Sequence, residues 1–221
     1  MGCLWRLLGY FVVNPGSTLA LAYAIEHPYR VKAMILRGVF LLRPKELNWY
    51  YQEGGASNIF PDYWEDFVRI IPPEERNDMI AAYYKRLTGT DEKVMLEAAM
   101  AWSRWEMATS KLEVDEKLLK KVQDPMWALQ FARIECHYFI NKGFFKTDNH
   151  ILDNIEKINH IPCHIIQGRY DVVCPMRSAW DLKQKWPIAQ LHIMPTSGHS
   201  ATEVAITKKI IECTDEYQTM L

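Results

Sequence analysis

Two loops of this 221-residue chain each carry one side chain of a pair that could do acid–base chemistry. Asp171 follows the run CHIIQGRY, and His199 lies in the loop PTSGHS that follows the run QLHIM. A carboxylate that accepts a hydrogen bond from an imidazole fixes its tautomer and stabilises the imidazolium that forms when the ring takes up a proton. An Asp and a His at this separation are a weak indication alone, because solvated loops also carry both residue types.

The runs before these loops have the pattern of buried strands. Residues 163–167 and 190–194 are short and apolar and lead into turn residues, and residues 31–37 form a similar run between Pro28 and Gly38. Functional groups in open α/β sheets gather at the carboxyl ends of the strands. Both Asp171 and His199 follow such an end, so we expect them to lie together.

Helical segments alternate with these strands. Asn14 is a suitable N-cap with Pro15 at the first helical position, and Pro28 ends the helix that they start. Residues 176–185 predict a second helix, stopped by Pro187, and a closing helix starts at about Glu203. This alternation predicts an α/β fold.

The middle of the chain, residues 44–154, differs in character. It is rich in Trp, Tyr, Glu and Lys, has helical periodicity between repeated Pro and Gly breakers, and shows no comparable strand signal. In its last helix an apolar stripe is predicted at Trp127, Phe131, Ile134 and Tyr138. We therefore predict three parts: an N-terminal segment (1–15), an α/β core (16–43 and 155–221) and a helical insertion (44–154).

Composition limits the function classes. The chain is 49% hydrophobic and 24% charged with a net charge of -1, which indicates a globular domain and disfavours nucleic acid or an anionic membrane as partner. Its five cysteines are widely spaced and include no CxxC pair, which favours reduced thiols in a cytoplasmic protein. The apolar start MGCLWRLLGYFVV lacks the basic region and cleavage site of a signal peptide. We expect no membrane span, no metal and no cofactor, because no ligand cluster or cofactor motif is evident.

Three longer stretches identify a resemblance. GSTLALAYAIEHPYRVKAMILRGVFLLRPKEL, WYYQEGG and HIIQGRYDVVCP with PTSGHS resemble the proline iminopeptidases, serine exopeptidases of the α/β-hydrolase fold. The resemblance runs from Gly16 to about Glu203 and includes the helical insertion. It implies an α/β-hydrolase core with a helical cap, with Asp171 as the triad acid and His199 as the general base.

The same resemblance implies a substrate site in the cap. Glu106 and Glu135 are similar to the family carboxylates that hold the free α-amine of the substrate, and peptides with N-terminal proline would be the partners. A partly buried carboxylate pair suits this role, because an exopeptidase must distinguish a charged amine from an internal peptide bond. Phe40, and Tyr50 or Tyr51, are similar to the aromatic residues around the proline ring.

The chain departs from the family at the nucleophile elbow, where the family reads Gly-Gly-Ser-Trp-Gly-Ser-Thr and this sequence reads VVNPGST. Asn14 stands at the nucleophile position, and an amide cannot replace the serine. Pro15 has no backbone N–H for the oxyanion hole. Ser17 matches a family serine that is not the nucleophile. The strands before the elbow are also absent, so we expect an incomplete sheet, a catalytically incompetent chain and a segment 1–15 that is not the natural upstream sequence.

Three functions remain open at this stage. The gene could encode a proline iminopeptidase that uses a serine, and this chain would then be an inactive form of it. The chain could be a pseudoenzyme that binds amine-ended peptides without turnover. A related hydrolase for an epoxide or ester is also compatible with the fold, although the glutamate pair disfavours it. The sequence leaves the oligomeric state open.

Overall fold

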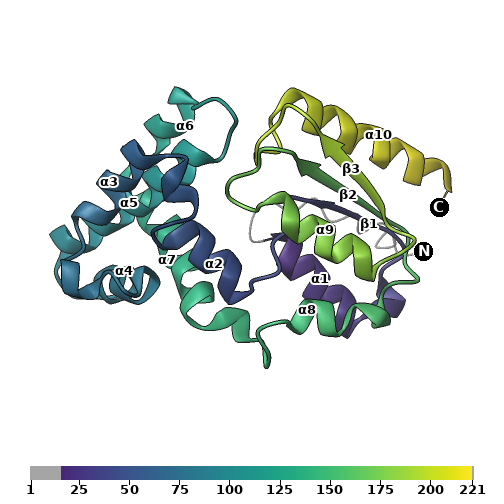
Figure 1. Cartoon of the computed structure of the whole chain (residues 1–221), viewed down its shortest axis with the longest axis horizontal. Helices are drawn as coiled ribbons and strands as arrows, with labels where there is room; N and C mark the ends of the chain where they lie inside the picture. Colours follow the sequence, from purple (N-terminus) through teal and green to yellow (C-terminus); the bar gives the residue numbers. More distant parts are fainter. Residues whose placement is uncertain (1–15, 221) are drawn as a thin grey trace, which may run out of the picture. The chain divides into compact units, whose positions relative to one another are not determined.

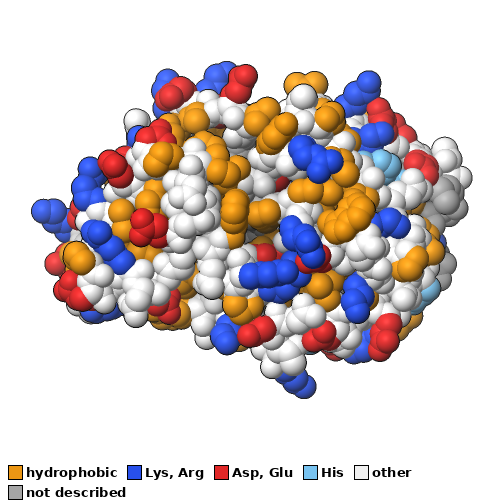
Figure 2. Space-filling model, in the orientation of Figure 1, with side chains coloured by type: hydrophobic (Ala, Val, Ile, Leu, Met, Phe, Trp, Pro, Cys, Tyr) orange, Lys and Arg blue, Asp and Glu red, His pale blue; other side chains and the backbone are white. Residues whose placement is uncertain are grey.

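The computed structural model describes residues 16–220, with side chains through residue 219. Within this range the chain divides into two compact units, an α/β unit (residues 16–41 and 149–220) and a helical unit (residues 42–148). No described helix is both long and apolar enough to cross a bilayer. On the face seen in Figure 2, acidic and basic side chains are interspersed, so neither sign dominates it.

The α/β unit is built around a parallel sheet. Among the described residues its strands are β1 (Met34–Arg37), β2 (Cys163–Gly168) and β3 (Gln190–Met194), in the order β1-β2-β3. Leu36 pairs with Ile165 and Ile165 with Leu191, so the three strands run in one direction and end at one edge. The α/β class and the strand at 190–194 are confirmed, and β2 extends one residue beyond its prediction.

The predicted strand at 31–37 is too long at its start. The N–H of Val31 donates to the carbonyl of Pro28 and closes a short 3₁₀ turn (Pro28–Arg30). Pairing with the sheet begins only at Met34, whose N–H donates to Pro162. The three residues before Met34 therefore make the transition from the turn to the sheet.

Four helices belong to the α/β unit: α1 (Gly16–Glu26), α8 (His150–Asp153), α9 (Met176–Lys185) and α10 (Val204–Met220). The predicted helix at 176–185 is confirmed, whereas the predicted helix start at Asn14 and Pro15 lies outside the described residues. Figure 1 shows α9 and α10 on opposite sides of the sheet. Ile206, Ile210 and Cys213 of α10 form a buried cluster with Ile166 of β2, which fixes α10 on its face.

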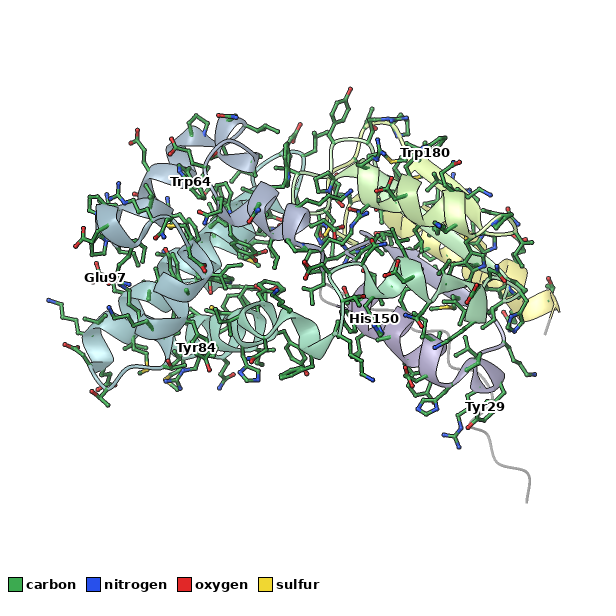
Figure 3. All side chains as sticks on the ribbon, turned by 60° about the horizontal axis from the view of Figure 1, so that its bottom comes forward. Tyr29, Trp64, Tyr84, Glu97, His150 and Trp180 are labelled. Carbon is green, nitrogen blue, oxygen red and sulfur yellow. The ribbon has the colours of Figure 1, made fainter. Side chains whose placement is uncertain are left out.

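The helical unit consists of α2 (Pro44–Tyr51), α3 (Pro61–Arg69), α4 (Met79–Leu87), α5 (Glu92–Thr109), α6 (Glu116–Lys121) and α7 (Pro125–Ile140), joined by short turns. Four of these helices begin at an aspartate whose carboxylate accepts a backbone N–H of the first turn: Asp78, Asp91, Asp115 and Asp124. Such caps satisfy N–H groups that the helix itself leaves unpaired. Trp64, labelled in Figure 3, is buried against Phe67 and Trp105.

The predicted apolar stripe of α7 is wrong. Ile134 and Tyr138 are 56% and 42% exposed, while the buried residues of α7 are Ala128, Leu129, Ala132, Glu135, Cys136 and Phe139. Small residues on this face let α5 approach closely, and the hydroxyl of Ser103 on α5 donates to the carbonyl of Ala128 at 3.2 Å. Close packing against α5 therefore outweighs the burial of larger side chains.

Candidate active site

In the α/β unit, Asp171 and His199 lie against one another at the carboxyl ends of β2 and β3. Nδ1 of His199 is 2.9 Å from Oδ2 and 3.1 Å from Oδ1 of Asp171, and both side chains are buried. The loops that carry them are joined by backbone hydrogen bonds, from Arg169 to Met194 and from Tyr170 to Ser197. The parallel register thus brings together two groups that are distant in the sequence.

Further donors hold the carboxylate of Asp171. Oδ1 accepts the backbone N–H of Cys174 at 2.8 Å, and Oδ2 accepts Nε2 of Gln167 at 2.8 Å. Gln167 is itself fixed, because its amide oxygen accepts the N–H of Val39 at 3.0 Å and its nitrogen also donates to the Cys174 carbonyl. Charge-assisted hydrogen bonds of this kind stabilise the ionised carboxylate.

Two glycines make room for this arrangement. Gly38 has φ of +57°, and a Cβ at this position would lie 2.7 Å from Cε1 of His199. A Cβ at Gly168 would overlap the carbonyl oxygen of Gly198. The imidazole therefore packs directly on the backbone that follows β1, which only glycine permits.

Arg37, at the end of β1, contacts the other side of the imidazole. Its Nη1 lies 2.9 Å from Nε2 of His199 and donates to the His199 carbonyl at 2.6 Å. A guanidinium only donates, so Nε2 is the acceptor and Nδ1 carries the hydrogen that Asp171 accepts. This is the tautomer that a general base requires. In this structure, however, the lone pair of Nε2 accepts a hydrogen bond from Arg37. Burial lowers the pKa of Arg37, and the charge of Asp171 opposes that effect.

The predicted nucleophile position, Asn14, lies outside the described residues. Ser17 is described, and its hydroxyl is engaged with the backbone: it donates to the carbonyl of Gly38 at 3.2 Å and accepts the N–H of Phe40 at 3.0 Å. The neighbouring hydroxyl of Thr18 donates to the Phe40 carbonyl at 2.7 Å. Ser17 thus ties α1 to the segment after β1.

In the helical unit, Glu106 of α5 and Glu135 of α7 are buried, with exposed fractions of 5% and 3%. The hydroxyl of Tyr51 donates to Oε1 of Glu106. Nε1 of Trp102 donates to Oε2 of Glu135 at 3.1 Å. Each carboxylate therefore has a neutral donor from an aromatic side chain.

This environment raises the proton affinity of both glutamates. Burial raises the pKa of Glu106 to about 7, and the hydrogen bonds of Tyr51 and Tyr50 oppose the rise. The pKa of Glu135 lies well above its ordinary range because of burial and then because of the negative charge of Glu106. The two carboxyls thus share a poorly solvated site in which one negative charge opposes the second.

Aromatic rings surround the Glu106 carboxylate. Tyr51 stacks on Trp102 with ring centroids 4.5 Å apart, and Tyr50 meets Tyr51 edge-on at 4.8 Å. The Tyr50 hydroxyl is also hydrogen-bonded to Thr109 at 2.6 Å, which links the tyrosine pair to the C-terminal end of α5. Phe40 belongs to the other unit, where it is buried beside Ser17 and Thr18.

A cavity of about 280 Å³ opens beside Tyr51. Leu42, Phe139 and Asp148 also line it, whereas Glu106 and Glu135 do not. The carboxylates are thus covered, and a cation that reached Glu106 would take the position of the Tyr51 hydroxyl.

Sequence reasoning missed three of these residues. Gln167 ends a predicted strand, Trp102 resembles ordinary core, and Arg37 carries a charge that sequence patterns place on the surface. The position of Arg37 and Gln167 at strand ends, beside Gly38 and the loop of Asp171, is the signal that could have identified them.

A family model described as the alpha/beta hydrolase fold matches residues 16–205. The chain is 55% identical over 202 residues to the "Probable proline iminopeptidase" of Leptolyngbya boryana, covering 91% of this chain and 63% of that protein. It is 49% identical over 207 residues to the proline iminopeptidase of Arabidopsis thaliana, with coverage of 93% and 54%. It therefore spans between about half and two thirds of the length of these relatives.

Solved structures support the fold independently of sequence. An alpha/beta fold family hydrolase from Bacillus anthracis superimposes with a TM-score of 0.52 at 18% identity, covering 93% of this chain and 64% of that one. A putative aryl esterase from Burkholderia cenocepacia gives 0.53 at 12% identity, with coverage of 92% and 61%. The described strands are an incomplete α/β-hydrolase sheet, as predicted. The chain belongs to the α/β-hydrolase fold family, and its relatives by sequence within that family are proline iminopeptidases.

Proposed function

We propose that this protein is of the proline iminopeptidase type, the serine-type hydrolases that release proline from the N-terminus of peptides, and that it retains the recognition site of that type. Asp171 and His199 are the triad acid and the general base, and Glu106 and Glu135 bind the α-amine of the substrate. The observation that carries the proposal is the buried carboxylate pair, Glu106 and Glu135, to which the aromatic side chains of Tyr51 and Trp102 donate neutral hydrogen bonds. The names of the relatives support proline as the residue recognised.

The chemistry follows from the geometry of each cluster. A prolyl N-terminus is a cation at neutral pH, and it replaces the proton that the glutamate pair otherwise retains. In the serine mechanism, Nε2 of His199 takes the nucleophile's proton and Asp171 stabilises the imidazolium. Arg37 occupies Nε2 in this structure, so it must move aside before Nε2 can accept that proton.

We further propose that the 221-residue chain binds such peptides without hydrolysing them. Asn14 supplies no nucleophile and Pro15 no oxyanion donor. Loss of one oxyanion donor alone typically costs about 10²–10³ in kcat. Occupation of Nε2 by Arg37 favours the same interpretation, a binding protein that retains the recognition site of an exopeptidase.

The test is calorimetry with a prolyl dipeptide and with its N-acetylated form as the matched control, alongside an assay of proline arylamide hydrolysis. We expect binding of the free amine only, a strong loss of affinity in Glu106→Gln, and no turnover. Affinity should rise with pH through about 7, because the amine requires the ionised form of Glu106. Equal binding of the acetylated peptide would refute the amine site, and turnover by the unmodified chain would refute the second proposal.

A further inference from the structure

A second group of ligand-type side chains lies in the α/β unit, near the start of β2, whereas Asp171 follows the end of that strand. His164 on β2, His192 on β3 and Cys213 on α10 place their nitrogen and sulfur atoms within 4.8 Å of one another. His164 is 1% exposed and Cys213 is 2% exposed, while His192 is half-buried at the strand edge.

The sheet register and one helix produce this convergence. His192 pairs with Ile166, which lies two residues after His164, so both imidazoles project from the same face of the sheet. Ile166 packs against Cys213 in the buried cluster under α10, so this face is the one that α10 covers. The three ligands come from three elements that are fixed before any ion binds.

The distances suit a small tetrahedral cation. Nδ1 of His164 and Nε2 of His192 are 2.9 Å apart, and two imidazole nitrogens on one zinc ion are about 3.3 Å apart given Zn–N bonds of about 2.0–2.1 Å. A shift of a few tenths of an ångström therefore replaces the shared hydrogen with an ion. When an ion binds, the hydrogen that the two imidazoles share moves to the outer nitrogen of its ring, and the proton of the Cys213 thiol passes to solvent.

The outer nitrogen of His164, Nε2, also fits a metal-bound histidine. Nε2 of His164 is buried and makes no hydrogen bond among the described residues. The carboxylate of Glu216, one turn after Cys213 on α10, lies 3.5 Å from this nitrogen. If Nδ1 binds a metal, Nε2 must carry the hydrogen, and a carboxylate next to that N–H is the usual outer partner of a metal-bound histidine.

The positive charge of Lys209 acts on both histidines and opposes an ion. Its ammonium is paired with the carboxylate of Glu212, which reduces its effect on the site. Glu216 is 47% exposed, so the carboxylate beside His164 is in contact with solvent.

We propose that His164, His192 and Cys213 bind one zinc ion, with Glu216 orienting His164 and water completing the tetrahedron. Two imidazoles and a thiolate are a ligand set that zinc prefers. The ion joins α10 to β2 and β3, so its role is to hold the last helix on the sheet. The members of this set are spread over three elements, so they form no local motif in the sequence.

The experiment uses the full untagged chain, stripped with chelator and titrated with zinc or cobalt alone. We expect one ion per chain, a higher melting temperature with zinc, and a cobalt spectrum with tetrahedral d–d bands and thiolate charge transfer. Cys213→Ser should remove the charge-transfer band, and His192→Gln should weaken zinc binding strongly. Glu216→Gln should weaken it about 10-fold, as loss of an outer partner does, while His160→Ala, at an exposed histidine, should change nothing.

Cobalt spectroscopy keeps the test valid if a variant folds poorly, because it reports on the unmodified chain. A six-coordinate cobalt spectrum, zinc binding that survives Cys213→Ser unchanged, or uptake of copper with no uptake of zinc would each overturn the proposal.

Discussion

The buried carboxylates of the α/β unit and of the helical unit differ in the hydrogen-bond donors around them. Asp171 accepts hydrogen bonds from His199, Gln167 and the backbone of Cys174, so its oxygens are satisfied within the protein. Glu106 and Glu135 have neutral aromatic donors, Tyr51 and Trp102, and their pKa values are raised. The comparison distinguishes a carboxylate that is a fixed structural part from a pair of carboxyls poised to bind an external cation.

The largest effect on stability should come from removing a hydrogen-bond donor of Asp171. Gln167→Leu removes the donor to Asp171 and also the hydrogen bonds that Gln167 makes with the N–H of Val39 and the carbonyl of Cys174. We expect a loss of about 3 kcal/mol in the free energy of unfolding, because unpaired buried polar groups cost about 1–3 kcal/mol each. Chemical denaturation measures it. Gln190→Leu, at an exposed position of β3, is the control, and an equal loss there would contradict the role of Gln167.

A substitution at the glutamate pair should change the free energy of unfolding in the opposite direction. The ordinary pKa of a glutamate is about 4.5 and burial raises that of Glu106 to about 7, so between these values the folded state holds a proton that the unfolded chain has lost. Stability therefore falls as pH rises through this window. Glu106→Gln removes the penalty, and we expect the variant to be more stable than the parent at pH 8, by on the order of 2 kcal/mol, with little difference at pH 4.5.

Thermal melts at both pH values measure this effect. Glu97→Gln is the matched control, because Glu97 lies on the same helix but is exposed (Figure 3). A variant at position 106 that loses as much stability between pH 4.5 and pH 8 as the parent does would show that Glu106 carries no such penalty.

A smaller effect should separate two tryptophans of α5. Nε1 of Trp102 donates to Glu135, whereas Nε1 of Trp105 is buried without a hydrogen-bond partner among the described residues. Trp102→Phe should therefore cost about 1 kcal/mol more than Trp105→Phe, although both remove the same atoms. Equal losses in denaturant would show that the contact with Glu135 contributes nothing.

The smallest effect concerns Tyr51. Its hydroxyl lowers the pKa of Glu106 against the rise caused by burial, so Tyr51→Phe should move the pH midpoint of peptide binding upward by about half a pH unit. Calorimetry across pH measures that midpoint. Tyr83→Phe, which loses a hydrogen bond to the Phe67 carbonyl, should leave the midpoint unchanged.

The parts of the site that sequence predicts are those set by strand direction. Asp171 and His199 each follow an apolar run, and parallel strands end at one edge, so their meeting could be expected before the structure. The buried face of α7 could not, since close packing on α5 selects Ala128 and Ala132 over larger neighbours. Arg37 and Gln167 were missed because their roles depend on cross-strand neighbours and not on any local pattern.

The cavity beside Tyr51 also shows how the helical unit is inserted in the chain. Leu42 and Asp148 are the first and last residues of the helical unit, and both line this cavity. The two ends of the unit therefore lie close together. An inserted segment with adjoining ends adds little closure entropy to the domain that hosts it. Such a segment can therefore change in length or sequence at little cost to the stability of the α/β unit into which it is inserted.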